Sequence, residues 1–83
     1  MRVRLHSHAQ ARLQERGSTE HEVSETVIGG ERFEGKYGRT GFRRNFPFDG
    51  HWQGKYYLNK QLEVYAVQEA GEWLVITVIA KYF

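Results

Sequence analysis

The chain has 83 residues, no cysteine and a net charge of +2 at neutral pH. A chain of this length is expected to form one domain, residues 1–83, with a small core. Without cysteine it has no disulfide, zinc ribbon or thiol nucleophile. No apolar run approaches the roughly 20 residues of a membrane span, and the first residues lack the apolar segment of a signal peptide. We therefore expect a cytoplasmic protein with no membrane partner.

The first predicted helix covers residues 8–16. Ser7 and Gln10 match a capping box, and the residues between them and Gly17 are good helix formers. Gly17 supplies the left-handed residue that commonly ends a helix.

The second predicted helix covers residues 20–28. Thr19 and Glu22 repeat the capping-box pattern, and apolar residues at helical spacing continue to the two glycines at 29–30. The exposed face of this helix is expected to be acidic.

After residue 30 the apolar period changes to two, which predicts strands. The expected strands cover residues 31–37, 41–47, 54–58, 61–68 and 73–81. Residues 47–54 are predicted as a loop, with Asp49 and Gly50 as the turn signal. The chain is therefore predicted to be α+β, with two N-terminal helices packed on one face of a twisted antiparallel sheet of four to five strands.

The turn between the last two predicted strands determines which side chains face the helices. A two-residue loop at Ala70 and Gly71 gives two mixed faces, whereas a left-handed bulge at Gly71 alone gives one wholly apolar face and avoids positive φ at Ala70. This second register pairs Ala66 with Leu74, Val64 with Ile76 and Leu62 with Val78. It predicts an outward face that carries Tyr65, Trp73, Thr77 and Lys81.

The charge is uneven along the chain. Residues 1–17 and 35–47 are basic, and residues 18–34 are acidic. If the fold brings the two basic segments together, they form a cationic face that can hold phosphate. An ordinary solvated surface is the alternative.

His8 lies in the first turn of the first predicted helix, and Arg12 and Arg16 follow at four-residue spacing along one stripe. The helix N-terminus disfavours an imidazolium, and a neutral histidine can act as a general base. The arginines could hold a phosphodiester through paired hydrogen bonds. A polar stripe with a capping histidine is the alternative.

No other motif points to a particular chemistry. His6 and His8 could share a metal only on one strand, and no acid is near them in sequence, so we expect neither a metal site nor a cofactor. Glu63 is the one acid expected on the outward face, where it could pair with Lys81 or act as a base; a plain surface residue is the alternative.

The segments "SHAQARLQERG" and "STEHEVSETVIGGE" resemble a motif of small, largely uncharacterised bacterial domains: H-A-x-x-R-x-x-E-R-G after a serine, then an acidic helix. "GRTGFRRNF", "LEVYAVQ" and "WLVITVIAKYF" resemble the sheet of that family. The family is grouped with the RelE/ParE-like toxins and, more distantly, with barnase-like and colicin-like ribonucleases. The resemblance implies two helices on a twisted antiparallel sheet and metal-independent RNA cleavage in active members.

The resemblance carries over to particular residues of this chain. Those matching the helix motif are Ser7, His8, Ala9, Arg12, Arg16 and Gly17. Thr77, Lys81 and Tyr82 are the kinds of residue found on the last strand of RelE-like nucleases. Ser18 replaces the isoleucine expected after Gly17, a departure that affects packing more than chemistry.

Three functions remain open on the sequence. The leading hypothesis is a ribonuclease toxin of a toxin–antitoxin pair, whose partners are RNA, free or on the ribosome, and a cognate antitoxin. Its base is His8 or, as a weaker candidate, Glu63. The residues expected to act in catalysis are His8, Arg12, Arg43, Thr77 and Lys81. Those expected to bind nucleic acid are Arg16, Arg39, Arg44, Tyr65, Trp73 and Tyr82. The alternatives are a non-enzymatic protein-binding module, such as a gyrase-targeting ParE-like toxin or an antitoxin-binding domain, and a small domain without catalytic activity.

Overall fold

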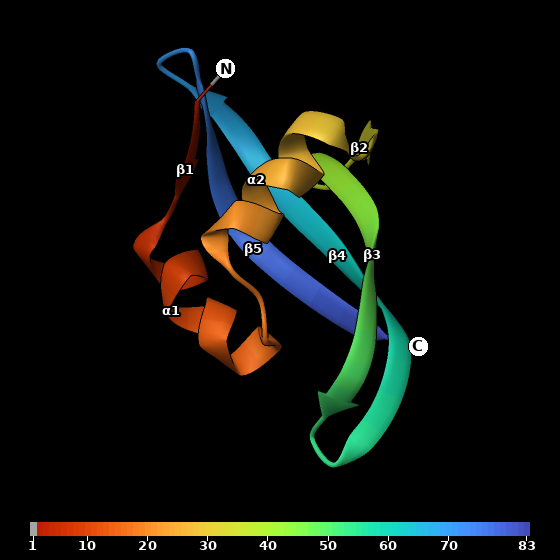
Figure 1. Ribbon diagram of the computed structural model, residues 1–83. Helices are drawn as coiled ribbons and strands as arrows, with labels where there is room; N and C mark the ends of the chain where they lie inside the picture. The colour runs from red at the N-terminus through yellow and green to blue at the C-terminus, as the bar shows by residue number, and fades with distance from the viewer. Residues whose placement is uncertain (1) are drawn as a thin grey trace.

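A computed structural model describes residues 2–83. Its elements in chain order are β1 (Val3–Leu5), α1 (Ser7–Arg16), α2 (Glu20–Gly29), β2 (Glu31–Glu34), β3 (Thr40–Trp52), β4 (Lys55–Glu69) and β5 (Glu72–Tyr82). The strands form one sheet in the order β1-β5-β4-β3-β2, and the two helices lie on one side of it (Figure 1). The predicted α+β class and the two N-terminal helices are confirmed.

The sheet is mixed, so the prediction of a wholly antiparallel sheet is wrong. β1 is parallel to β5 and pairs Val3 with Trp73 and Leu5 with Val75. Three residues are too few to show a strand period, which is why the sequence pattern did not reveal β1. Since β1 covers only the start of β5, the rest of that strand lies beside α1, where Arg16 Nε donates to the Val78 carbonyl at 3.4 Å.

β3 and β4 form one long hairpin in place of the predicted loop at 47–54. The register of the pair shifts between Pro47 and Gly50, and pairing then continues as far as Trp52 and Lys55. The chain reverses at residues 53–54, which have φ of 51° and 81°. The predicted strands 54–58 and 61–68 are therefore parts of a single strand, and the distal hairpin curls beyond the core (Figure 1).

The register of the β4–β5 hairpin differs from the predicted one. Ala70 and Gly71 form a two-residue loop with φ of 53° and 76°, so the hairpin accepts the positive φ that the predicted register avoided. The structure pairs Ala66 with Val75, Val64 with Val78 and Leu62 with Ala80. Ile76 is the extra residue of a β-bulge, and it keeps apolar side chains on the helix side both before and after it.

The bulge turns Trp73 toward the helices, so its predicted outward position is wrong. Its side chain is buried and packs edge-to-face on Phe42, with ring centroids 5.1 Å apart. The predicted outward positions of Tyr65, Thr77 and Lys81 are confirmed, because all three line the side of the sheet away from the core.

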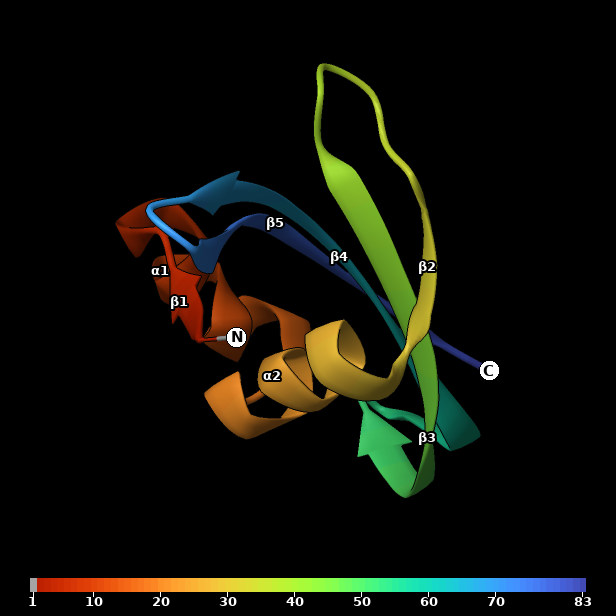
Figure 2. The same cartoon turned by 90° about the horizontal axis from the view of Figure 1, so that it is seen from above.

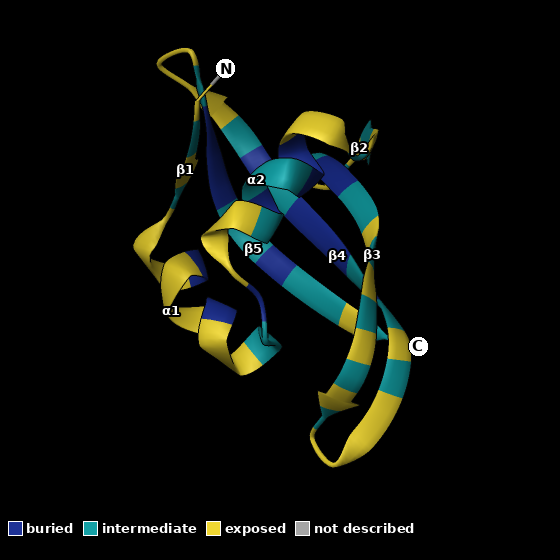
Figure 3. Cartoon of the chain, in the orientation of Figure 1, coloured by how far each residue is buried: buried dark blue, intermediate teal, exposed yellow. Residues whose placement is uncertain are grey.

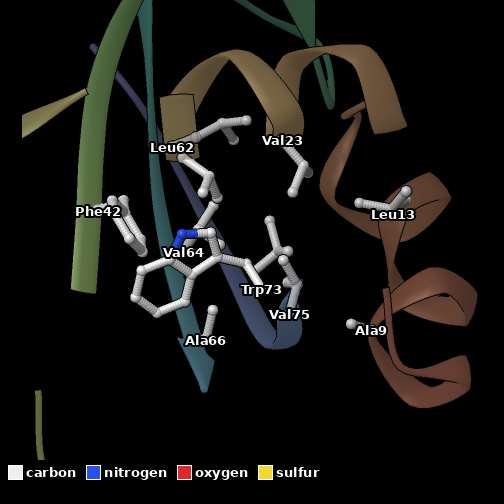
Figure 4. Close-up of a cluster of buried hydrophobic side chains, with 11 residues drawn as sticks. Ala9, Leu13, Val23, Phe42, Leu62, Val64, Ala66, Trp73 and Val75 are labelled. Atoms are coloured by element: carbon white, nitrogen blue, oxygen red, sulfur yellow. The ribbon is translucent and has the colours of Figure 1, made fainter. Parts of the chain in front are cut away.

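The core lies between the helices and the middle of β4 and β5 (Figure 3). Figure 4 shows Leu13 of α1 and Val23 of α2 pointing toward Leu62, Val64 and Val75. Each large aliphatic side chain that is fully buried contributes about 1.5–3 kcal/mol to folding. This packing fixes both helices against the sheet and so positions the exposed stripe of α1.

His6, and not Ser7, caps α1. The His6 Nδ1 accepts a hydrogen bond from the His8 N–H at 3.1 Å, and Ser7 is already helical. Gly17 ends the helix at a φ of 67°, as predicted.

A buried cation ties β4 to the connection between the helices. Only 3% of Lys60 is exposed, and its Nζ donates to the Gly17 carbonyl at 3.0 Å and lies 2.8 Å from a Glu22 carboxylate oxygen. Glu22 also completes the predicted capping box of α2, since its carboxylate accepts from the Thr19 N–H at 3.0 Å. One carboxylate thus joins the start of α2 to the sheet.

Candidate functional site

The exposed stripe of α1 faces a small hollow beside the bulged part of β5. We call this the α1–β5 hollow; its volume is about 90 Å³. The residues that line it are His8, Ala9, Arg12, Arg16, Ile76, Thr77 and Val78. Three residues expected on one helical stripe are therefore joined by Thr77, which lies more than sixty positions later in the chain.

The charged groups of this hollow differ in how firmly they are held. Arg16 is half-buried and bonded to the Val78 carbonyl. Arg12 is exposed and lies 3.7 Å from Glu15, an ion pair of a kind that contributes little to stability. The His8 side chain is exposed, and the backbone N–H of His8 donates to the His6 ring. The Arg12 and His8 side chains can therefore turn toward a ligand at small cost.

The size and charge of the α1–β5 hollow favour a single anionic group. Small-molecule sites usually have volumes of roughly 300–1,000 Å³, so about 90 Å³ suits one phosphate. Guanidinium groups bind phosphate oxygens through paired, planar hydrogen bonds.

A second hollow lies on the side of the sheet away from the helices. The β2–β3 turn rises on that side (Figure 2) and, with β4 and β5, borders an open hollow of about 470 Å³. We call this the outer hollow. It is lined by Glu34, Gly35, Lys36, Tyr37, Arg39, Tyr65, Thr77 and Ile79. Thr77 lines both hollows, so the two are neighbours.

Three side chains that can donate hydrogen bonds surround the Glu63 carboxylate beside the outer hollow. Its carboxylate accepts from the Tyr65 hydroxyl at 2.5 Å and lies 3.3 Å from Arg43 Nε and 3.7 Å from Lys81 Nζ. The hydrogen bond from Tyr65, helped by Arg43 and Lys81 and opposed by burial, lowers the pKa of Glu63. The same bond raises the pKa of the Tyr65 phenol. Arg43 and Lys81, predicted to act in catalysis, are therefore engaged with an acid of the same face.

This cluster predicts an acid-sensitive contribution to stability. Because the pKa of Glu63 is lowered from 4.5 in the folded chain, the contribution is present above that value and is lost as pH falls below it. We expect the free energy of unfolding, measured with urea, to fall less between about pH 5 and about pH 3 in Glu63→Gln than in the original chain. Tyr65→Phe should lie in between, because it removes one of the donors. An unchanged slope in both variants would contradict this assignment.

Three other residues predicted to bind nucleic acid lie on the helix side of the sheet. Trp73 is buried. Arg44 donates to the Glu25 carbonyl of α2 at 3.2 Å. The Tyr82 hydroxyl donates to the Arg16 carbonyl at 2.6 Å, and its ring stacks on Trp52. The structure thus brings together His8, Arg12, Arg16 and Thr77 in one hollow and Arg39, Tyr65 and Thr77 in the next.

Two residues of the outer hollow were missed by the sequence analysis, Lys36 and Tyr37. Both lie in the turn between β2 and β3, and Tyr37 is 89% exposed with a φ of 59°. An aromatic and a cation between Gly35 and Gly38 were the available signal, because an aromatic ring at the tip of a hairpin contributes nothing to a core.

Comparison of the chain with protein-family models, with curated proteins and with solved structures finds no match. Within residues 2–83, no group of three or more histidine or acidic side chains is arranged to hold a metal ion. In the same range, neither helix has the length and apolarity needed to cross a membrane.

Proposed function

We propose that this domain is a metal-independent ribonuclease, the toxin of a toxin–antitoxin pair, and that it acts at the α1–β5 hollow. The observation that carries the proposal is the meeting of His8, Arg12 and Arg16 with Thr77 around a space suited to one phosphate. The order of two helices and a twisted sheet is compatible with the RelE/ParE-like fold that the sequence motifs resemble.

The chemistry proposed for this hollow needs a base and stabilisation of charge on the phosphate. His8 takes the proton of the RNA 2′-hydroxyl, whose oxygen attacks the adjacent phosphorus. The bond from phosphorus to the 5′-oxygen breaks, and that oxygen takes a proton from water. Arg12 and Arg16 hold the non-bridging oxygens, on which charge develops in the transition state. The products are a 2′,3′-cyclic phosphate and a 5′-hydroxyl.

We predict that RNA cleavage continues in excess EDTA, because the proposed charge stabilisation comes from guanidinium groups. The experiment incubates the purified domain with a single-stranded RNA and analyses the ends of the fragments. The expected ends are cyclic phosphate and 5′-hydroxyl. Cleavage that stops in EDTA and returns with a divalent ion, or fragments with 5′-phosphates, would contradict the mechanism.

A protein-binding function is the second candidate, favoured by apolar side chains on the distal hairpin. Tyr56 and Leu58, two positions apart on β4, are exposed on the same side of the strand. Phe83 is also exposed, but its backbone pairs with Asn59, so its ring lies on the other side. Neighbouring exposed apolar side chains are typical of protein contacts. In the leading proposal this surface is available to the antitoxin; in the second candidate, binding there is the whole function.

A further inference from the structure

Tyr37 presents an aromatic ring to solvent at the tip of the β2–β3 turn. It is 89% exposed, so its ring adds almost nothing to the core. Its φ of 59° is also a conformation that residues with a Cβ adopt at a cost. A large, exposed aromatic residue that adopts an unfavourable backbone conformation beside a hollow is a candidate for stacking on a ligand.

The outer hollow is held in place by packing beneath it. Gly35 brings the turn close to Tyr65: a Cβ at this position would lie 2.9 Å from the Arg39 carbonyl oxygen and 3.2 Å from Tyr65 Cδ1. Phe33 packs edge-to-face on the Tyr65 ring at 5.9 Å. The Tyr65 hydroxyl is bonded to Glu63. Tyr65 therefore forms a fixed floor, and the turn that carries Tyr37 forms a wall.

The size and the side chains of the outer hollow fit a nucleotide better than a lone anion. A volume of about 470 Å³ lies within the usual range for sites that hold small organic molecules. Lys36 and Arg39 supply two cations against the single acid Glu34. Aromatic rings beside cations are the usual means of binding single-stranded nucleic acid, because bases stack on the rings and phosphates pair with the cations.

Thr77 places this hollow next to the one assigned to the scissile phosphate, since it lines both. We infer that the outer hollow binds one nucleotide of single-stranded RNA next to that phosphate, with its base on Tyr37 and Tyr65 and its own phosphate near Lys36 and Arg39. The inference rests on the proposed function for its choice of RNA. Beyond that function, the inference adds a nucleotide-binding subsite formed by the β2–β3 turn with β4 and β5.

Binding and cleavage are tested separately. A short fluorescein-labelled single-stranded DNA serves as the binding probe, because it lacks the 2′-hydroxyl and cannot be cleaved by the proposed route. Fluorescence anisotropy compares the original chain with Tyr37→Asn, which tolerates positive φ but cannot stack, and with Tyr37→Phe, which can. Phe83→Asn removes another exposed aromatic ring and is the matched control; its backbone pairs with Asn59, six positions along β4 from Tyr65 of the hollow.

We expect Tyr37→Asn to weaken binding by about five- to one-hundredfold, the effect of losing one stacked base. Tyr37→Phe and Phe83→Asn should stay within about twofold of the original chain. An abasic strand of the same length should bind the original chain at least as weakly as the intact strand binds Tyr37→Asn, because it also loses the contact with Tyr65. Circular dichroism checks that each variant is folded.

The outcomes separate this inference from the proposed ribonuclease activity. Strong probe binding that depends on Tyr37, without RNA cleavage, supports the subsite and overturns the ribonuclease. Cleavage with the same KM in Tyr37→Asn overturns the subsite and leaves the ribonuclease standing. Probe binding that is absent, or that is equal for the intact and the abasic strand, also overturns the subsite, whether or not RNA is cleaved.

Discussion

Replacing His8 with glutamine will reduce RNA cleavage by roughly 10²–10⁴-fold, the usual contribution of a general base. The thermal midpoint should change by no more than a few degrees, because the side chain is exposed and lines the α1–β5 hollow without entering the core. Cleavage is measured by release of labelled fragments, and stability by thermal melting of the same preparation.

His6 provides the matched control, because it carries the capping role that His8 lacks. His6→Ala removes the Nδ1 that accepts from the His8 N–H, and it should cost about 1 kcal/mol of stability with a much smaller effect on cleavage. Arg12→Ala should lower cleavage as well, and Arg12→Lys should not fully restore it, since lysine lacks the planar pair of donors. Full activity in both His8→Gln and Arg12→Ala would exclude α1 from the chemistry.

Replacing Glu22 with glutamine will destabilise the fold by about 2–4 kcal/mol. Glutamine can still complete the capping box, but it leaves the buried Lys60 ammonium without its counter-charge. Loss of one partner from a buried pair costs about 3–5 kcal/mol, and we take a lower range because the Glu22 side chain is 24% exposed. The measurement is urea unfolding near neutral pH.

The double variant Lys60→Met with Glu22→Gln tests the reason for that loss. Removing both charges avoids the unpaired ammonium, so the double variant should be more stable than Glu22→Gln alone. If the loss of stability in the double variant equals the sum of the losses in Glu22→Gln and Lys60→Met measured separately, the two side chains act independently and the pair does not hold β4 to α2.

The parts of the fold that depend on local chemistry could be predicted from the sequence. The Gly17 stop and the capping box of Thr19 and Glu22 involve neighbours in the chain, and both are as predicted. β1 could not be found, because its partner Trp73 is some seventy residues away and its own pattern is three residues long. The bulge at Ile76 was missed because the predicted register assumed an unbroken pairing.

The parts of the candidate site that depend on local spacing could also be predicted, whereas those that depend on contacts between distant strands could not. Helical spacing alone placed His8, Arg12 and Arg16 together, and the register beyond the bulge leaves Thr77 facing outward as predicted. Trp73 was misplaced because it lies on the other side of the bulge, where the alternation of faces is reversed. A pairing of Glu63 with Lys81 was one of the expected possibilities, and the structure contains it. The approach of Arg43 to the same carboxylate depends on a third strand, which no short stretch of sequence reveals.

The pairing of β1 with β5 has a consequence for how the chain folds as it is synthesised. Val3, Arg4 and Leu5 find their strand partners only among residues 73–75, so the sheet is incomplete until the ribosome has made nearly the whole domain. Such distant pairing makes folding slow, because a long loop must close before the contact contributes. Thr77 lies just beyond those partners, so the hollow beside α1 cannot assemble before residue 77 has been made. A nuclease built in this way would stay harmless to the ribosome that translates it until translation of the domain is almost finished.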